Sequence, residues 1–211
     1  MNLKTETEDL ENKLQKKIII ATANPHKLEE INEINKYPNI EFEIIKGNFN
    51  PEENGSTYEE NAFIKAKAAA DLTKKYCLAD DSGLCVDVLD GAPGLHSARY
   101  AGTQNEKIQK LLNELKSVEQ EKRTAHFISV MVLVDEKGEI IHKTEGKVYG
   151  LISTEPKGTH GFGYDPIFFL PQYNKSMAEL SSYEKNSLSH RAKALTSMLE
   201  WIDINLTHPK Q

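Results

Sequence analysis

The chain reads Tyr76-Cys77-Leu78-Ala79-Asp80-Asp81-Ser82-Gly83-Leu84 at the point that decides its fold. An apolar run is followed at once by two carboxylates and a turn, which predicts a strand over residues 78–80 that stops at the acidic pair. In open α/β sheets, ligands bind outside the carboxyl ends of the strands. Adjacent carboxylates repel each other there unless a cation or a proton compensates them. A divalent ion such as Mg²⁺ fits this position, and a turn with two solvated acids has the same local pattern.

Strand and helix patterns alternate before this stretch. A buried strand is expected over residues 17–21, and an amphipathic helix over residues 26–36. A further strand follows over residues 41–45. Thr57-Tyr58-Glu59-Glu60 is a capping box for an alanine-rich helix that runs to about Lys75. The alternation predicts an α/β fold with helices flanking the sheet.

The second half of the chain predicts antiparallel strands. A helix is expected near residues 104–115, and two β-branched runs follow over residues 125–134 and 139–148. Between them, Asp135-Glu136-Lys137-Gly138 predicts a hairpin with a four-residue turn. Ser189 can cap a last helix, whose apolar face is formed by Ala192, Leu195, Leu199 and Ile202. The sheet is therefore expected to be mixed.

Length and composition limit the class of protein. With 211 residues, of which 38% are apolar, the chain can bury one sizeable core, so we expect one domain over residues 17–211 after a hydrophilic tail over residues 1–16. The formal charge of −6 argues against a nucleic-acid partner, because binding to a phosphate backbone needs excess Lys and Arg.

The first residues, the apolar stretches and the cysteines bear on the cellular location of the protein. The start of the chain is too hydrophilic for a signal peptide, and the longest apolar stretch, residues 127–134, is too short to span a membrane. Cys77 and Cys85 form no metal-binding spacing and are expected to be reduced thiols in the core. These features predict a cytoplasmic protein with no membrane partner.

A candidate phosphate-binding turn follows the first strand. Thr22-Ala23-Asn24-Pro25-His26-Lys27 joins that strand to the first helix, where backbone N–H groups and the helix N-terminus would face an anion. The turn lacks the glycines of a P-loop or a Rossmann fingerprint, so those two folds are poor matches. The same residues also form ordinary turns, and the local signal is weak.

Three further segments carry candidate ligand-binding groups. Glu52-Glu53 precedes the capping box, and Lys65 falls on the helix that the box begins. Gly161-Phe162-Gly163-Tyr164-Asp165-Pro166 can bring backbone close to a ligand and offer a ring for stacking. Lys185, His190 and Arg191 stand before or in the first turn of the last helix. Taken singly, each of these is also compatible with a surface charge or a tight turn.

Together, these segments resemble the inosine triphosphate pyrophosphatase family, whose members hydrolyse XTP, ITP and dITP to the monophosphate and pyrophosphate. The resemblance covers residues 17–195. Its six motifs are Thr22-Ala23-Asn24-Pro25-His26-Lys27, Tyr58-Glu59-Glu60-Asn61-Ala62 with Lys65, Ala79-Asp80-Asp81-Ser82-Gly83-Leu84, Gly91-Ala92-Pro93-Gly94 with Ser97-Ala98-Arg99-Tyr100, Gly161-Phe162-Gly163-Tyr164-Asp165-Pro166, and Ser189-His190-Arg191. The resemblance implies an elongated mixed α/β fold of two lobes with a central cleft, a divalent metal, usually Mg²⁺, and a homodimer.

The resemblance also assigns the phosphate end of the site. Asp81 would be the proton acceptor and a metal ligand, and Ser82 would touch the nucleotide. The second metal ligand is ambiguous between Glu52 and Glu53, and the spacing from Lys65 favours Glu53. The triphosphate would be held by Thr22, Ala23, Asn24, Pro25, His26, Lys27 and Lys65.

At the base end, Phe162 would stack on the base, and Asp165 with Lys185 would help to fix the nucleotide. His190 with Arg191 would read the edge of the base. The substrate-binding residues of this end are Phe162, Gly163, Tyr164, Asp165, Lys185, His190 and Arg191. The chain departs from the family pattern at Ala23, where the family usually has Gly, and in the tail before residue 17.

Phosphoryl transfer mainly needs neutralisation of the phosphate charge and a water molecule positioned in line with the leaving group. The site residues named above offer groups for both tasks. Mg²⁺ at Asp81 and Glu53 would bridge phosphate oxygens, while Lys27 and Lys65 would neutralise the leaving pyrophosphate. Two other interpretations stay open. One is a Maf-like nucleotide pyrophosphatase, against which the Phe162 loop and the His190-Arg191 pair argue. The other is a non-catalytic nucleotide-binding protein on the same scaffold. An aspartyl phosphatase is excluded, because neighbouring carboxylates lie on opposite sides of a strand.

Overall fold

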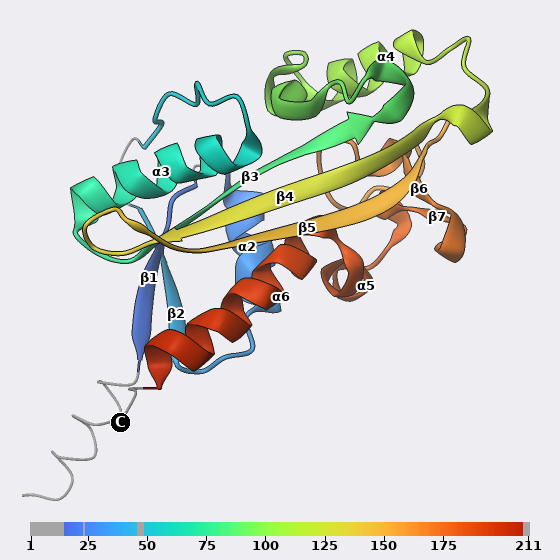
Figure 1. The fold of residues 1–211 in the computed structure, drawn as a ribbon. Helices are drawn as coiled ribbons and strands as arrows, with labels where there is room; N and C mark the ends of the chain where they lie inside the picture. The colour runs from blue at the N-terminus through green and yellow to red at the C-terminus, as the bar shows by residue number, and fades with distance from the viewer. Residues whose placement is uncertain (1–14, 23, 46–48, 209–211) are drawn as a thin grey trace, which may run out of the picture.

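A mixed β-sheet runs through the length of the computed structural model, which describes residues 15–22, 24–45 and 49–208 (Figure 1). β1 is parallel to both of its neighbours, and each later pair in the sheet is antiparallel. The strands lie in the order β2 (Ile40–Ile44), β1 (Lys16–Ile20), β3 (Cys77–Val86), β4 (Thr124–Val134), β5 (Ile140–Ile152), β6 (Phe168–Leu170) and β7 (Lys175–Ser176). The predicted mixed α/β sheet is confirmed.

Helices cover both faces of this sheet. α3 (Tyr58–Thr73) packs on the face that carries Ala79 and Val132, and α4 (Gln104–Glu114) packs with Leu84 and Phe127 of the other face. In Figure 1, α5 (Ser182–Leu188) and α6 (His190–Ile202) lie below the sheet. α2 (Pro25–Ile34) packs against α5 and α6. None of the helices in the described ranges is long and apolar enough to cross a membrane.

The apolar core is divided between two lobes. In the first lobe, Ile18 and Leu195 belong to a cluster between the sheet and α2 and α6, and Ala66 belongs to a cluster under α3. In the second lobe, Leu111 of α4 and Phe168 of β6 belong to a separate cluster. β3, β4 and β5 contribute to both lobes and join them.

Helix starts follow the capping residues that the sequence offers. The Thr57 side chain accepts a hydrogen bond from Glu60 N at 3.1 Å, and Ser189 accepts one from Ala192 N at 3.1 Å, so both predicted starts are confirmed. The carboxylate of Glu60 accepts from the backbone N–H of Ser56, one residue before the N-cap. The predicted apolar face of α6 is buried at Ala192, Leu195, Leu199 and Ile202.

The prediction that a strand ends at the acidic pair is wrong. β3 continues to Val86 and pairs with β4 along its whole length. Ser82-Gly83 looked like a turn, but Gly83 lies inside the strand, where a Cβ atom would stand 2.4 Å from the Gly94 carbonyl oxygen. The strand that ends here is β1, whose last residue Ile20 pairs with Leu78. The acidic pair therefore lies mid-strand in β3, beside the carboxyl end of β1.

Other boundaries shift little. The β4–β5 hairpin is confirmed, and the Asp135 carboxylate accepts hydrogen bonds from the N–H groups of Lys137 and Glu139 in its turn. β1 begins at Lys16, one residue before the predicted start of the domain. Cys77 and Cys85 are free thiols, and only Cys77 is fully buried.

Candidate functional site

A cleft of about 470 Å³ lies between the two lobes and brings together residues from distant parts of the chain. Ala23 lies outside the described residues, as do the side chains of Pro25 and His26. The other predicted site residues line the cleft: Thr22, Asn24, Lys27, Glu53, Lys65, Asp81, Ser82, Phe162, Gly163, Tyr164, Asp165, Lys185, His190 and Arg191.

The first strand-to-helix turn supplies one end of the cleft. Thr22 Oγ1 accepts a hydrogen bond from Asn24 N at 3.1 Å, and Lys27 N donates to the Asn24 carbonyl oxygen at 3.2 Å. α2 begins at Pro25, a residue suited to the first helical position because it has no N–H to lose. The start of α2 beside the cleft-lining Thr22, Asn24 and Lys27 is an arrangement suited to an anion.

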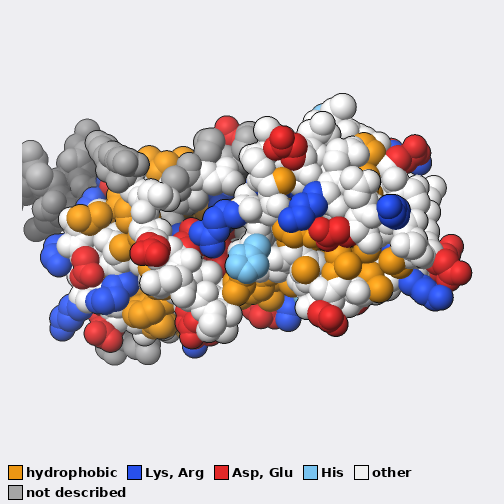
Figure 2. All heavy atoms as spheres, turned by 90° about the horizontal axis from the view of Figure 1, so that it is seen from above, with side chains coloured by type: hydrophobic (Ala, Val, Ile, Leu, Met, Phe, Trp, Pro, Cys, Tyr) orange, Lys and Arg blue, Asp and Glu red, His pale blue; other side chains and the backbone are white. Residues whose placement is uncertain are grey.

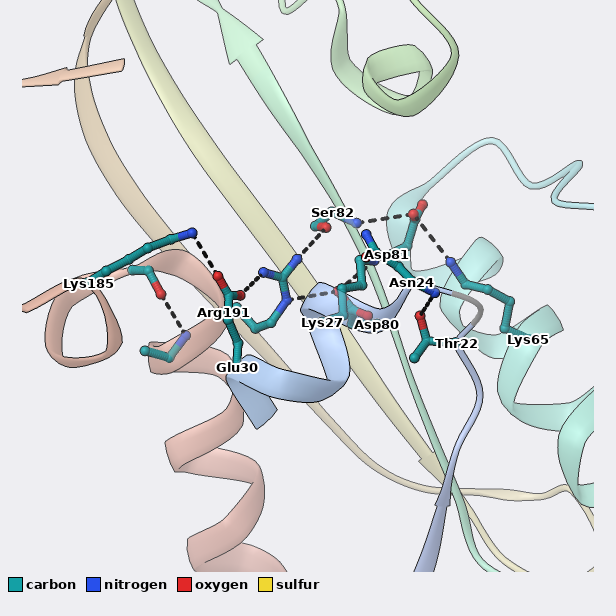
Figure 3. Close-up of polar contacts among 12 residues, drawn as sticks. Thr22, Asn24, Lys27, Glu30, Lys65, Asp80, Asp81, Ser82, Lys185 and Arg191 are labelled. Atoms are coloured by element: carbon teal, nitrogen blue, oxygen red, sulfur yellow. Dashed lines mark hydrogen bonds and ion pairs between the residues drawn. The ribbon is translucent and has the colours of Figure 1, made fainter. Parts of the chain in front are cut away.

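Asp80 and Asp81 direct their carboxylates to opposite faces of β3, as the alternation of strand side chains requires (Figure 3). On the face toward α3, Asp81 Oδ2 accepts a hydrogen bond from Asn61 Nδ2 at 3.2 Å. On the face toward α2 and α6, Asp80 Oδ2 lies 2.9 Å from Lys27 Nζ and 3.4 Å from Arg191 Nε. The prediction that the two carboxylates lie on opposite sides of the strand is confirmed.

Lys65 stands between two carboxylates on the α3 side. Its Nζ lies 3.0 Å from Glu53 Oε2 and 3.5 Å from Asp81 Oδ1. Burial raises the pKa of the Asp81 carboxyl, and the Lys65 ammonium only partly opposes this shift. A carboxylate with a raised pKa is better suited to accept a proton from water near neutral pH.

The same donors suit a hard divalent cation. The Glu53 and Asp81 carboxylates converge on one cation, the Lys65 ammonium, and Mg²⁺ is commonly held by one or two carboxylates with substrate phosphates and water. Within the described part of the chain, no group of three or more His, Cys, Asp or Glu side chains forms a complete protein cage. Glu53 lines the cleft, whereas Glu52 is exposed outside its lining, and this placement favours Glu53.

Asp80 links the two ends of the cleft. Burial alone would raise its pKa, but the Lys27 ammonium and the Arg191 guanidinium hold the pKa of the Asp80 carboxyl well below its usual range. Burial also lowers the pKa of Lys27, and the Asp80 charge opposes that effect. The acid is therefore ionised and keeps two buried cations in place.

Glu30 of α2 extends this network to the base end. One of its oxygens lies 2.7 Å from Lys185 Nζ, and the other accepts a hydrogen bond from Arg191 (Figure 3). Sequence reasoning missed Glu30, although its position three residues after Lys27 places both side chains on one helix face.

Asp165 holds the Phe162 loop against Lys185. Its Oδ2 accepts hydrogen bonds from Lys185 Nζ at 2.9 Å and from Phe162 N at 2.9 Å. The Lys185 ammonium lies 4.8 Å from the centre of the Phe162 ring. Contacts with the second lobe fix the same loop. Gln104 Oε1 accepts a hydrogen bond from Gly163 N at 3.1 Å, and the Tyr164 hydroxyl donates one to the Ser97 carbonyl oxygen at 3.0 Å.

His190 is a buried neutral imidazole. Its ring stacks on Phe127 at 4.9 Å with an interplanar angle of 13°. Burial and the charges of Arg191 and Lys185 lower its pKa well below the ordinary value of 6.5. Its Nδ1 is buried and makes no hydrogen bond within the described residues, and such a nitrogen calls for a polar partner.

Several residues at the site had no recognisable signal in the sequence. Phe127 lies in an apolar strand, and Gln104 and Lys107 lie in an ordinary helix, yet all three line the cleft. Asn61 belongs to one of the six motifs, but its contact with Asp81 was not predicted. Only the tertiary arrangement brings these residues to the site.

Similarity to known proteins identifies the family. The sequence model of the Ham1 family matches residues 18–201. The chain belongs to the Ham1 family. A dITP/XTP pyrophosphatase of Clostridium perfringens is 47% identical over 199 residues, a match that covers 87% of this chain and 95% of that protein. A dITP/XTP pyrophosphatase of Bacillus subtilis is 46% identical over 196 residues, covering 90% of this chain and 98% of that protein.

Solved structures of Ham1 proteins have the same fold. A HAM1 protein from Coxiella burnetii superimposes with a TM-score of 0.80 at 39% identity, covering 89% of this chain and 98% of that chain. The Ham1 protein of Staphylococcus aureus matches with the same values. The family resemblance and the elongated fold expected from the sequence are confirmed, and Ham1 membership favours the first interpretation over a Maf-like protein.

Proposed function

We propose that this protein hydrolyses the non-standard purine nucleoside triphosphates ITP, dITP and XTP to the monophosphate and pyrophosphate. The observation that carries the proposal is the pairing of two unlike ends in one cleft. Thr22, Lys27 and Lys65 suit a phosphate chain, whereas the neutral His190, stacked on Phe127, and the Phe162 ring suit a flat base. The names of the relatives in Clostridium perfringens and Bacillus subtilis support the same substrate class.

The reaction proposed is attack of water on the phosphorus nearest the sugar. Asp81 accepts the proton of the water, for which its raised pKa is suited. Lys65 and Lys27 neutralise the pyrophosphate as it leaves. Lys27 and Lys65 both line the cleft, so they offer an anion two positive charges although the chain carries a net charge of −6.

We further propose that Glu53 and Asp81 hold Mg²⁺ with the help of substrate oxygens. Such an ion would supply charge neutralisation on the phosphates and lower the pKa of water. Asn61 keeps the Asp81 carboxylate oriented for this role through its hydrogen bond to Oδ2.

Base selection follows from hydrogen bonding. Hypoxanthine and xanthine present an oxygen acceptor at position 6, whereas adenine presents an amino donor. A neutral His190 offers one N–H, and Arg191 is a donor only, so these residues pair with the oxygen and face the adenine amino group donor to donor. Leaving buried polar groups unpaired in this way costs about 1–3 kcal/mol.

A panel of nucleoside triphosphates with Mg²⁺ tests the proposal. Pyrophosphate is measured separately from orthophosphate, with ITP, XTP, dITP, ATP and GTP as substrates. We expect kcat/KM for ITP or XTP to exceed that for ATP and GTP by at least about 10²-fold. Orthophosphate as the first product, or equal use of ATP, would contradict the assignment. Binding without multiple turnover would favour the non-catalytic alternative.

The assembly and the cellular setting are proposals of the same kind. We propose a homodimer that works in the cytoplasm without a nucleic-acid partner. Support for an interface comes from two exposed apolar side chains: Tyr149 of β5 is 66% exposed, and Val88, in the turn after β3, is 47% exposed. Figure 2 shows hydrophobic side chains gathered on one part of the surface. Sedimentation equilibrium tests the dimer, and cell fractionation tests the compartment.

A further inference from the structure

Three small residues form a row across the middle of the sheet. Ser82 of β3 pairs with Ser129 of β4, and Ser129 pairs with Gly146 of β5. Directly paired residues of neighbouring strands point to the same face. This face is the one that α6 covers, because Ser82 Oγ accepts a hydrogen bond from Arg191 of that helix at 3.2 Å. We call Ser82, Ser129 and Gly146 the small-residue row.

The first turn of α6 rests directly on this row. A Cβ atom on Gly146 would lie 2.1 Å from the His190 carbonyl oxygen and 2.6 Å from Ala194 N. Both are main-chain atoms, so no side-chain rotation could relieve the contact. Ser129 is fully buried, and its hydroxyl has no hydrogen-bond partner among the described residues. The small size of the row, and not a hydrogen bond of Ser129, therefore lets the helix come this close to the sheet.

Two residues beside the row also fix the distance between α6 and the sheet. Thr144, on the same face of β5, donates its hydroxyl hydrogen to the Ala194 carbonyl oxygen at 2.9 Å. Phe127, two residues before Ser129 on β4, supports the ring of His190. The depth of the small-residue row thus fixes where the first turn of α6 stands above the sheet.

We propose that Gly146 is a positioning residue for recognition of the purine base. It does not line the cleft and acts through α6, by letting His190 and Arg191 stand deep enough to reach the edge of the base. The inference rests on the proposed function for the identity of the ligand. It adds a residue on β5, outside the motifs of the cleft, to the determinants of specificity.

Two product probes separate the ends of the site. Inosine monophosphate reports on the base end, and pyrophosphate reports on Thr22, Lys27 and Lys65. Calorimetry on Gly146→Ala should show at least about a tenfold loss of affinity for inosine monophosphate, since a displacement of about 1 Å in an active site can cost 10²-fold. Affinity for pyrophosphate should stay within about twofold, because Lys27 and Lys65 keep their contacts with Asp80 and Asp81, which lie on β3 and not on α6.

Three variants control for volume and stability. Ser129→Ala removes an unpaired hydroxyl without adding atoms and should leave both affinities unchanged. Ser129→Val adds bulk at the centre of the row and should repeat the selective loss of inosine monophosphate. Val134→Ala weakens the core on the opposite face, under α3, and should leave the ratio of the two affinities unchanged.

The kinetic readout is the ratio of kcat/KM for ITP to that for ATP. As a single substitution, Gly146→Ala should lower this ratio. In a chain that already carries Arg191→Ala it should change the ratio little, because both substitutions act on the contact between α6 and the base. An equal loss of affinity for both inosine monophosphate and pyrophosphate, or no loss of affinity for either, would overturn the role of Gly146. If the unaltered chain neither binds inosine monophosphate nor cleaves ITP, the proposed function falls, and the role of Gly146 with it.

Discussion

Asp80 and Asp81 are adjacent in β3, and their carboxylates serve opposite faces of the sheet. Asp80 joins Lys27 to Arg191 beneath the cleft. Asp81 meets Lys65 at the opposite face. The two acids therefore have separate tasks, and their substitutions should have different consequences.

Asp81→Asn should lower kcat by at least about 10²-fold, the low end for loss of a general base. The amide keeps the shape of the side chain, and Lys65 keeps its contact with Glu53, so the fold should persist. Steady-state kinetics with ITP and Mg²⁺ measure the effect. A near-normal turnover would remove Asp81 from the reaction.

Asp80→Asn should act mainly on stability and on KM. The change leaves the buried Lys27 and Arg191 without their shared carboxylate, and breaking a buried ion pair in this way costs about 3 kcal/mol. Urea unfolding of this variant beside Asp81→Asn gives the comparison. Equal unfolding free energies for the two variants would argue against the linking role of Asp80.

Glu53→Gln should raise the Mg²⁺ concentration that gives half-maximal activity, because an amide is a poorer ligand for this ion than a carboxylate. Glu52→Gln is the matched control. It removes the same charge one residue away, outside the cleft lining, and should leave the Mg²⁺ titration unchanged. A larger effect at Glu52 would reverse the assignment.

His190 should make stability depend on pH. Its folded pKa lies below the ordinary value of 6.5, so the unfolded chain binds a proton between these values that the folded chain does not. Stability therefore falls as pH drops below about 6.5, by up to about 1.4 kcal/mol per pH unit. Urea unfolding at pH 7.5 and 5.5 should show a smaller drop for His190→Gln, which cannot titrate.

Deletion of residues 1–14 should leave activity and Tm nearly unchanged, because the segment is hydrophilic and has few apolar residues to bury. Deletion through Lys17 should lower Tm, since it removes residues of β1 that pair with Ile40 and Glu41. Thermal unfolding of the two shortened chains tests both expectations. A large loss of Tm in the shorter deletion would show that the tail contributes to the fold.

Much of the fold could be predicted from local patterns. The start of α3 at Thr57 and of α6 at Ser189 depends on side chains that lie next to the helices they cap. The β4–β5 hairpin was visible because its turn residues interrupt two apolar runs. Such signals depend on residues close together in the chain.

The errors have long-range causes. β3 was predicted to end at Asp80 because Ser82-Gly83 has the composition of a turn, whereas pairing with β4 keeps the strand extended to Val86. Glu30 could not be assigned because its partners Lys185 and Arg191 lie far along the chain. The short strands β6 and β7 gave no pattern of their own.

The three strands that join the lobes also have a consequence for substrate length. β3, β4 and β5 run unbroken from one lobe to the other, so the span between Lys65 and the Phe162 loop is set by the sheet and not by a flexible connection. The length of the cleft therefore selects the length of the ligand. A nucleotide contacts both ends only if its phosphate chain has the right number of phosphate groups. Inosine diphosphate, one phosphate shorter, should leave one end empty and be cleaved far more slowly than ITP.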